Sequence, residues 1–307
     1  MLVPLLGQNI VSPPQAKQAE PPDSGDTVFS SETRLVPLNV TVTDKSGHLV
    51  TNLPQSAFQV FENGVQQQIR LFKREDVPVS MALIIDNSGS MREKRQSVES
   101  AALALVKDSN PMDEVCVINF NDEVYLDTDF TNDISKMEQG LTKIDSRGGT
   151  AMRDAIRLSV EHLHDKAKRD KKVILVVTDG NDNASVVSLD GLVRQAEEND
   201  VLIYAIGLLT EEDRREAKKA QRALQLLTES TGGSVFYPKD VSEVDRIAHQ
   251  VAHDIRNQYT IAYTPTNAAL DGTFRQVKVT VRAAGNPVAR TRSGYYATAD
   301  KGKAAKN

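Results

Sequence analysis

The chain has 307 residues, enough for one large domain or two ordinary ones with a substantial buried core. Its formal net charge is −5 with acidic and basic residues interleaved, so no basic patch argues for nucleic-acid binding. The single cysteine, Cys116, excludes an internal disulfide framework and a cysteine-based zinc cluster, and no apolar run approaches the roughly 18–20 residues that span a bilayer.

Residues 1–33 are predicted to form a disordered tether, because they are rich in proline and polar residues and show no hydrophobic periodicity. The apolar segment LVPLL is too short for a complete signal peptide and lacks its basic flank, but it fits the remnant of one. We therefore expect an exported protein (periplasmic, cell-envelope or secreted), with a cytoplasmic location as the open alternative. Residues 299–307 are expected to form a disordered tail.

Residues 34–76 have the pattern of β-strands. RLVPLNVTVTD alternates apolar and polar residues before the turn sequence DKSG, and FQVFE and VQQQIRLF flank Asn63-Gly64, a strong hairpin signal. The β pattern returns over residues 258–298 in QYTIAYTP, FRQVKVTVRA and ARTRSGYYA. Neither flank alone has enough strands to be stable, so we predict that the two pair into one small antiparallel β domain.

Residues 77–257 alternate between short apolar strands and amphipathic helices. VYLDTDF, residues 124–130, is expected to add an antiparallel edge strand. Short continuous apolar strands separated by helices indicate an α/β fold: a doubly wound, mostly parallel sheet with helices on both faces, inserted in the β domain. The expected strands are MALII, VCVINF, KVILVVT, VLIYAIGLL and SVFYP, and the expected helices cover 92–108, 134–144, 150–165, 189–199, 212–230 and 241–257.

Oxygen-bearing side chains follow several of these elements. The first apolar strand ends at Asp86, with hydroxyls at Ser88 and Ser90, while the RGGTAM loop carries Thr150 and the VVTDG strand end carries Asp179. Ligands of open parallel sheets bind beyond the carboxyl ends of the strands, where these loops are expected. Hard oxygen donors select Mg²⁺, or the related Mn²⁺ and Ca²⁺, over zinc or copper. A shell rich in neutral hydroxyls leaves metal charge uncompensated, and an open position would attract a carboxylate.

D-x-S-x-S at 86–90, GGT at 148–150 and TDG at 178–180, in this order on an alternating strand and helix pattern, resemble the von Willebrand factor A-type domain. The resemblance covers residues 79–257 and implies a Rossmann-like fold whose metal-ion-dependent adhesion site has all five positions filled. It also implies a protein partner whose Asp or Glu completes the metal coordination. The flanks containing VTDKSG, FQVFENG and ARTRSGYYA are similar to bacterial proteins related to this family, which are generally exported.

Other interpretations of the same residues stay open at this stage. Ser88 or Ser90 could cap a helix, and Thr150 and Asp154 could serve a helix N-terminus. A strand-end aspartate also occurs in aspartyl-phosphate phosphotransferases, but their second carboxylate is replaced here by Ser88. HQVAH, residues 249–253, has the spacing of a helical zinc-protease motif without its glutamate.

We expect a non-enzymatic adhesion or scaffolding module that uses one Mg²⁺-class ion to capture an acidic residue of a protein partner. The alternatives are an assembly domain with a vestigial metal site and a metal-dependent phosphotransferase. No transmembrane segment and no nucleic-acid partner is expected, and the sequence leaves the oligomeric state open. In some A-type domains movement of the last helix, here residues 241–257, changes affinity, which is a hypothesis for this chain.

Overall fold

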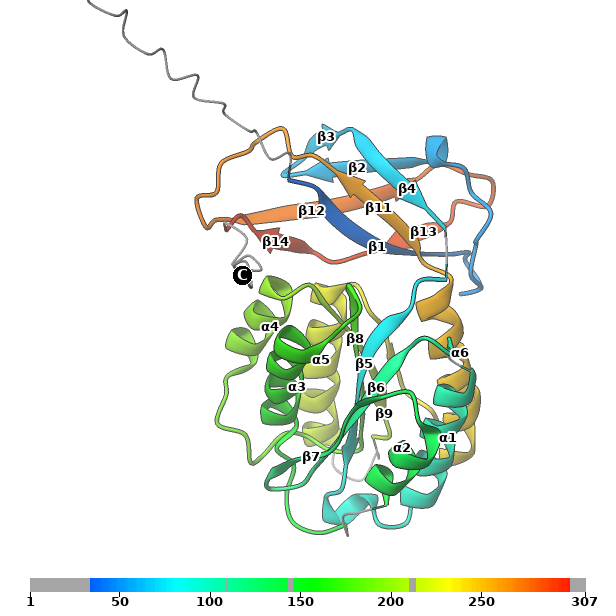
Figure 1. Cartoon of the computed structure of the whole chain (residues 1–307), viewed down its shortest axis with the longest axis vertical. Coiled ribbons are helices and arrows are strands. Elements are labelled where there is room, and N and C mark those ends of the chain that lie inside the picture. Colours follow the sequence, from blue (N-terminus) through cyan, green and yellow to red (C-terminus); the bar gives the residue numbers. More distant parts are fainter. Residues whose placement is uncertain (1–33, 75, 109, 143–145, 210–213, 299–307) are drawn as a thin grey trace, which may run out of the picture. The chain divides into compact units, whose positions relative to one another are not determined.

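The computed structural model describes residues 34–74, 76–108, 110–142, 146–209 and 214–298. The predicted tether at 1–33 and tail at 299–307 lie outside these ranges. The described residues form a six-stranded sheet flanked by helices and two four-stranded sheets (Figure 1). Within these ranges, no helix combines the length and the apolar character that crossing a bilayer requires.

The central sheet is parallel except at one edge, and its strand order is β10-β9-β8-β5-β6-β7. Its inner strands are continuous apolar runs, because helices cover both of their faces. The predicted antiparallel edge strand is confirmed, since β7 pairs antiparallel with β6. The strands are β5 (Val79–Asp86), β6 (Glu114–Phe120), β7 (Val124–Thr131), β8 (Lys171–Thr178), β9 (Val201–Gly207) and β10 (Val235–Phe236).

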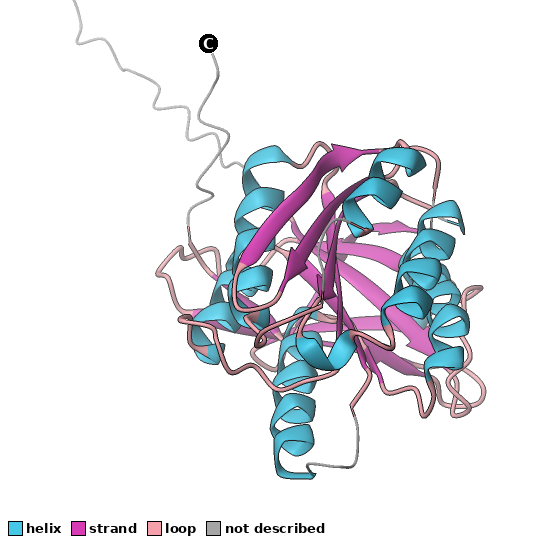
Figure 2. Cartoon of the chain, turned by 90° about the horizontal axis from the view of Figure 1, so that it is seen from below, coloured by secondary structure: helices cyan, strands magenta, loops and turns pink. Residues whose placement is uncertain are grey.

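Helices pack against both faces of this sheet (Figure 2). In β5 alternate side chains enter opposite cores: Leu83 lies in one buried cluster and Ile84 in the other. One face carries α1 (Arg95–Asp108), α2 (Ile134–Leu141) and α6 (Val244–Arg256). The other carries α3 (Met152–Lys166), α4 (Leu189–Glu198) and α5 (Arg214–Thr231).

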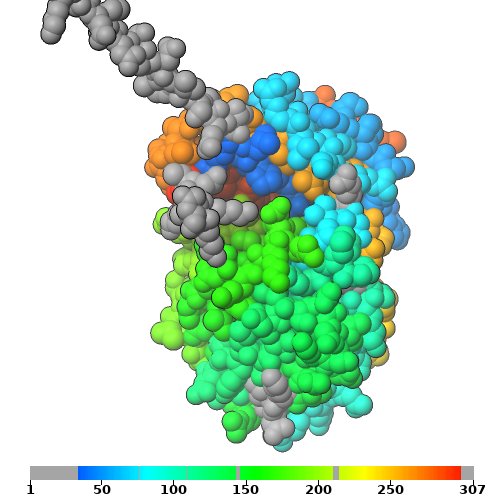
Figure 3. Space-filling view, viewed as in Figure 1, coloured from blue at the N-terminus to red at the C-terminus, as the bar shows by residue number. Residues whose placement is uncertain are grey.

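The two smaller sheets are antiparallel, and each contains strands from both sequence flanks. Figure 3 shows atoms from the blue and the orange parts of the sequence side by side in this region. The sheets share a core that includes Val40, Val60 and Tyr259. The predicted fold class, a doubly wound sheet inserted in a small antiparallel β domain, is therefore confirmed. One sheet has the order β13 (Val288–Arg290), β1 (Val36–Thr43), β11 (Tyr259–Tyr263), β4 (Ile69–Lys73), and the other β14 (Gly294–Tyr296), β12 (Phe274–Val281), β2 (Phe58–Glu62), β3 (Val65–Gln67).

The predicted hairpin forms, but its second strand is divided. Asn63 and Gly64 take φ values of 47° and 80°, as the tight turn requires. VQQQIRLF does not continue as one strand, because β3 pairs with β2 whereas β4 pairs with β11 of the other sheet. Beside the break, the Gln67 amide bonds both the backbone N–H and the hydroxyl of Thr266. The segment thus passes from one sheet to the other at the edge of the β domain.

The connections to the β domain enter the α/β unit at the amino ends of the parallel strands. The chain leaves β4 at Lys73 and begins β5 at Val79, and α6 ends at Arg256 just before β11. The Lys171 ammonium at the start of β8 lies 2.5 Å from the carbonyl oxygen of Ile255 near the end of α6. Because eight extended residues span roughly 26 Å, the end of β5 lies far from these connections. The carboxyl ends of the parallel strands therefore lie away from the β domain.

Candidate metal centre

Asp86 is the last residue of β5, beside the end of the neighbouring parallel strand β8. One of its carboxylate oxygens accepts a hydrogen bond from the Thr178 hydroxyl at 2.6 Å, and the other accepts the backbone N–H of Ser88 at 2.8 Å. The side chain is almost fully buried. Burial raises the pKa of Asp86 to about 6, the nearby charge of Asp179 adds to that rise, and the two hydrogen bonds oppose it. A charged carboxylate here lacks compensation that a bound cation would supply.

The two serine hydroxyls connect this strand end to Asp179. The Ser88 and Ser90 Oγ atoms lie 3.2 Å apart, and the Ser90 hydroxyl donates to Asp179 Oδ1 at 2.7 Å. Ser88 does precede the short 3₁₀ helix Gly89–Met91, but its side chain makes no capping hydrogen bond. Capping therefore does not explain either hydroxyl. Ser88 and Asp179 are buried, whereas Ser90 is exposed, so the cluster opens to solvent at Ser90.

Thr150 approaches the same place from the third loop. Its side chain is buried, and its Oγ1 lies 3.5 Å from the position that a Cβ on Gly180 would take. Its backbone N–H donates to Asn183 Oδ1 at 2.9 Å. The interpretation of Thr150 as a helix cap is wrong, because Ala151 is the N-cap residue of α3. The structure thus places all five predicted residues in loops at the carboxyl ends of the parallel strands.

Backbone hydrogen bonds tie the three loops together. Gly89 N donates to Gly148 O at 3.3 Å, Arg147 N to Asn87 O at 2.9 Å, and Asn183 N to Thr150 O at 3.1 Å. Gly148 has φ of +74°, which favours glycine, and a Cβ on Gly149 would lie 2.7 Å from the Asp122 carboxylate, which would have to shift. Asp122 Oδ1 accepts the Gly149 N–H at 2.6 Å. The oxygens are therefore held in place by the fold around them.

Lys94 is a member of the site that sequence analysis missed. Its ammonium lies 2.6 Å from Asp179 Oδ2 and 3.5 Å from the carbonyl oxygen of Leu208. The lysine side chain is only 19% exposed, so this pair is shielded from solvent more than a surface ion pair is. In the sequence, only its position four residues after Ser90 hints at a place near the site. Its surroundings, REKR at 92–95, are typical of the solvent-exposed start of a helix.

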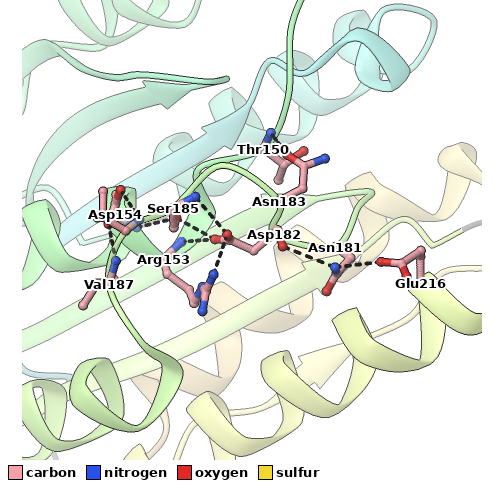
Figure 4. Close-up of polar contacts among 10 residues, drawn as sticks. Thr150, Arg153, Asp154, Asn181, Asp182, Asn183, Ser185, Val187 and Glu216 are labelled. Atoms are coloured by element: carbon pink, nitrogen blue, oxygen red, sulfur yellow. Dashed lines mark hydrogen bonds and ion pairs between the residues drawn. The ribbon is translucent and has the colours of Figure 1, made fainter.

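A second polar network braces the loop that follows β8 (Figure 4). The Asp182 carboxylate accepts the backbone N–H of Arg153 at 2.7 Å, its guanidinium at 3.0 Å and the Ser185 hydroxyl at 2.7 Å. Asp154 lies in the first turn of α3, where an acidic side chain favours the helix dipole as expected. Its oxygens also accept the N–H groups of Val186 and Val187 at 3.0 and 3.2 Å, so it anchors the following loop as well.

The donor set fits a hard cation. Two carboxylates and three hydroxyls are all oxygen donors, which Mg²⁺ and Ca²⁺ prefer, whereas zinc sites usually include nitrogen or sulfur ligands. Among the described residues, no group of three or more His, Cys, Asp and Glu side chains is placed to hold a metal ion. His249 of HQVAH instead contacts Asp108 of α1 and lies 3.6 Å from Asp245.

Comparisons with known proteins agree with this architecture. The family model for the von Willebrand factor type A domain matches residues 81–181. A solved structure described as von Willebrand factor type A from Catenulispora acidiphila is 12% identical, with a TM-score of 0.51 over 87% of this chain and 75% of that chain. A search of the curated proteins found no match.

Two further structures are similar to part of the chain. The conserved hypothetical protein BatB from Bacteroides thetaiotaomicron is 18% identical, with a TM-score of 0.47 over 58% of this chain and 98% of that chain. The vWF domain of the type V pili tip protein Mfa5 from Porphyromonas gingivalis is 13% identical, with a TM-score of 0.47 over 59% of this chain and 97% of that chain. Residues 81–181 of the chain thus match the family model for the von Willebrand factor type A domain, and the observed topology resembles the fold of the solved structure from Catenulispora acidiphila.

Proposed function

We propose that this protein is a divalent-cation-dependent protein-binding module. Ser88, Ser90 and Thr150 would hold one Mg²⁺-class ion through their hydroxyls, and Asp86 and Asp179 would hold it directly or through water. The observation that carries the proposal is the continuous line of contacts from Asp86 through Ser88 and Ser90 to Asp179, with the Thr150 hydroxyl beside Gly180. The line joins loops that are as many as 89 residues apart in sequence.

The bound ion would supply a positive centre that attracts an anionic group. A buried carboxylate such as Asp86 is costly to ionise without a nearby cation, so metal binding would also stabilise this edge of the sheet. The exposed Ser90 leaves the cluster open on one side, and an Asp or Glu of a protein partner can approach there. Each of the five side chains acts by binding or orienting, and none is required to transfer a proton.

A non-enzymatic role is part of the proposal. Phosphotransferases with a strand-end aspartate use a second carboxylate two residues later, and here that position is Ser88, whose hydroxyl lies against Ser90. The module would act outside the cytoplasm, in keeping with the similarity of its β flanks to exported bacterial proteins. The competing function is an assembly domain whose site no longer binds metal, and the Lys94–Asp179 ion pair gives that alternative a specific basis, since it already neutralises one carboxylate.

Partner capture with and without metal tests the proposal. The immobilised chain is exposed to native extract in Mg²⁺, washed, and eluted with EDTA, in parallel with the variants Ser88→Ala and Ser100→Ala. Ser100 is a matched control, because its hydroxyl bonds a carbonyl oxygen within α1 and is exposed. We expect EDTA to release a partner from the native chain and from Ser100→Ala, and Ser88→Ala to retain at least about tenfold less. A partner that stays bound in EDTA supports the assembly alternative.

A further inference from the structure

Asn87 lies between Asp86 and Ser88 in the D-x-S-x-S loop, and its side chain is buried. Its backbone N–H donates to Phe120 O at 2.7 Å, and its carbonyl oxygen accepts the backbone N–H of Arg147 at 2.9 Å. Phe120 ends β6, and Arg147 begins the RGGTAM loop. This one residue therefore connects the end of β5 to two other segments around the proposed metal centre.

The side-chain amide of Asn87 extends this connection into the interior. Its Nδ2 donates to Ile85 O at 3.2 Å and to Asn119 Oδ1 at 2.7 Å. Asn119 lies in β6 and is fully buried. Its own Nδ2 donates to Asp127 Oδ2 of β7 at 2.8 Å and to Gly140 O of α2 at 2.9 Å. Two amides thus join the D-x-S-x-S loop to β7 and α2.

The partners of Asn119 dictate which way both amides face. Asp127 and Gly140 present oxygen acceptors, so the amide nitrogen of Asn119 faces them and its oxygen faces Asn87. Asn87 must then present its nitrogen to Asn119, and its own Oδ1 is left buried without a hydrogen-bond partner among the described residues. A buried acceptor without a donor costs free energy that an apolar side chain would avoid. That cost is explained if the two bonds donated by Asn87 are needed to hold the loop.

We propose that Asn87 and Asn119 are positioning residues that hold Asp86 and Ser88 in the arrangement that binds the metal. The inference rests on the proposed function and deepens it, because it assigns to two buried amides outside the donor set the task of keeping the donors in place. Asn119 acts through Asn87, and Asn87 acts through its backbone, since Asp86 and Ser88 are its direct neighbours in the chain. Hydrogen-bonding partners behind metal ligands commonly determine metal affinity in this way.

Calorimetric titration with Mg²⁺ tests the inference on Asn87→Ala, Asn119→Ala, the double variant and Gln258→Ala. Gln258 is a matched control: it is a buried amide whose nitrogen donates to the Thr41 and Tyr204 hydroxyls, and its oxygen also has no partner within the described ranges. It lies between α6 and β11, at the connection to the β domain and away from the proposed metal centre. Urea unfolding without metal gives the stability of each variant.

We expect each single variant of the pair to bind Mg²⁺ about tenfold more weakly than the native chain. The double variant should bind no more weakly than the weaker of the two single variants, because the two amides act as one unit. Gln258→Ala should lose stability and keep the native affinity. A loss of affinity in the pair is then separated from a general weakening of the fold.

Asn87→Asp separates positioning from charge, and it decides the question if an alanine variant does not fold. Its ionised carboxylate has about the size of the amide, but it cannot donate to Ile85 O or to Asn119 Oδ1. The added negative charge alone would tighten Mg²⁺ binding. Loss of the two donated bonds should instead make binding weaker than in the native chain.

Four results would overturn the inference and leave the proposed function intact. They are native affinity in either alanine variant of the pair, additive losses in the double variant, an equal loss in Gln258→Ala, and tighter binding by Asn87→Asp. A native chain that takes up no Mg²⁺ would overturn the proposed function, and the inference with it.

Discussion

Two carboxylate networks at the same edge of the central sheet differ in what surrounds their oxygens. Asp154 and Asp182 accept backbone N–H groups of the helix start and the following loop, supplemented by an arginine and a serine. Asp179 instead meets a side-chain hydroxyl and an ammonium, and Asp86 meets a hydroxyl and one backbone N–H. Backbone donors fix a carboxylate in the fold, whereas side-chain donors can turn away and leave its oxygens to a cation. Neighbouring aspartates thus form a structural brace in one network and belong to the proposed metal centre in the other.

The largest effect is expected on Mg²⁺ affinity when Asp86, a residue of the proposed metal centre, is substituted. Asp86→Asn should weaken Mg²⁺ binding at least about 100-fold, or about 2.7 kcal/mol, because it removes a charged oxygen donor from the centre. The rise in melting temperature on adding Mg²⁺ measures this, since a ligand that binds only the folded state raises its stability. Without metal, the variant should be at least as stable as the native chain. An unchanged Mg²⁺-dependent shift would place the binding site elsewhere.

Substitution in the network of Asp154 and Asp182 should instead lower stability and leave Mg²⁺ affinity unchanged. Asp154→Ala leaves the N–H groups of Val186 and Val187 without their acceptor and should lower the free energy of unfolding by about 1–2 kcal/mol. Urea unfolding without metal measures this loss. Asp190→Ala, in the first turn of α4, is the control and should change stability by less than about 1 kcal/mol. If Asp154→Ala reduced metal affinity as strongly as Asp86→Asn does, the distinction between brace and centre would fail.

Substitution of Lys94 is expected to have a smaller effect on Mg²⁺ affinity, and to raise it. Lys94→Met removes a positive charge that competes for Asp179, so Mg²⁺ affinity should rise roughly fivefold, or about 1 kcal/mol. Calorimetric titration with Mg²⁺ measures the change, with Lys107→Met, on the exposed last turn of α1, as the control. Weaker binding by Lys94→Met would mean that the lysine supports the metal-bound arrangement instead of opposing it.

Asp254, in α6, is a buried carboxylate outside the proposed metal centre, and it should make the stability of the fold depend on pH. Burial raises its pKa to about 6, against the opposing charge of Arg290 at 3.8 Å. A carboxyl whose folded pKa is raised stabilises the fold less as pH rises, so this contribution is lost between about pH 4 and pH 6. Because a shift of about two pKa units corresponds to roughly 3 kcal/mol, Asp254→Asn should lose that much less stability than the native chain over this interval. Parallel stability-versus-pH curves would contradict the assignment.

Much of the architecture and the centre could be predicted from local pattern. Continuous apolar strands alternating with amphipathic helices indicated the parallel sheet, and strand-end chemistry indicated Asp86 and Asp179. The division of VQQQIRLF between two sheets could not be predicted in this way, because its apolar residues suit either sheet and the break depends on a partner 199 residues away, Thr266.

The contacts missed around the centre share a cause. Lys94 meets a carboxylate 85 positions along the chain but looks locally like an ordinary helix residue. Thr178 belongs to the TDG motif, yet nothing local shows that its hydroxyl donates to Asp86, 92 positions away. Asp154 was assigned to its own helix terminus, because nothing in the neighbouring sequence indicates that its carboxylate accepts hydrogen bonds from Val186 and Val187. Side chains that act across strands follow from the fold, and only the motif residues carry their own signal.

The central claim is that these five oxygen-bearing side chains hold one hard divalent cation. Electron paramagnetic resonance of free Mn²⁺ tests it most directly, because protein-bound ions are lost from the signal and can be counted. The account predicts one Mn²⁺ per native chain, displaced by Mg²⁺ and absent from Asp86→Asn. An unchanged free-ion signal in the presence of native protein, or an equal number of ions bound by Asp86→Asn, would contradict it.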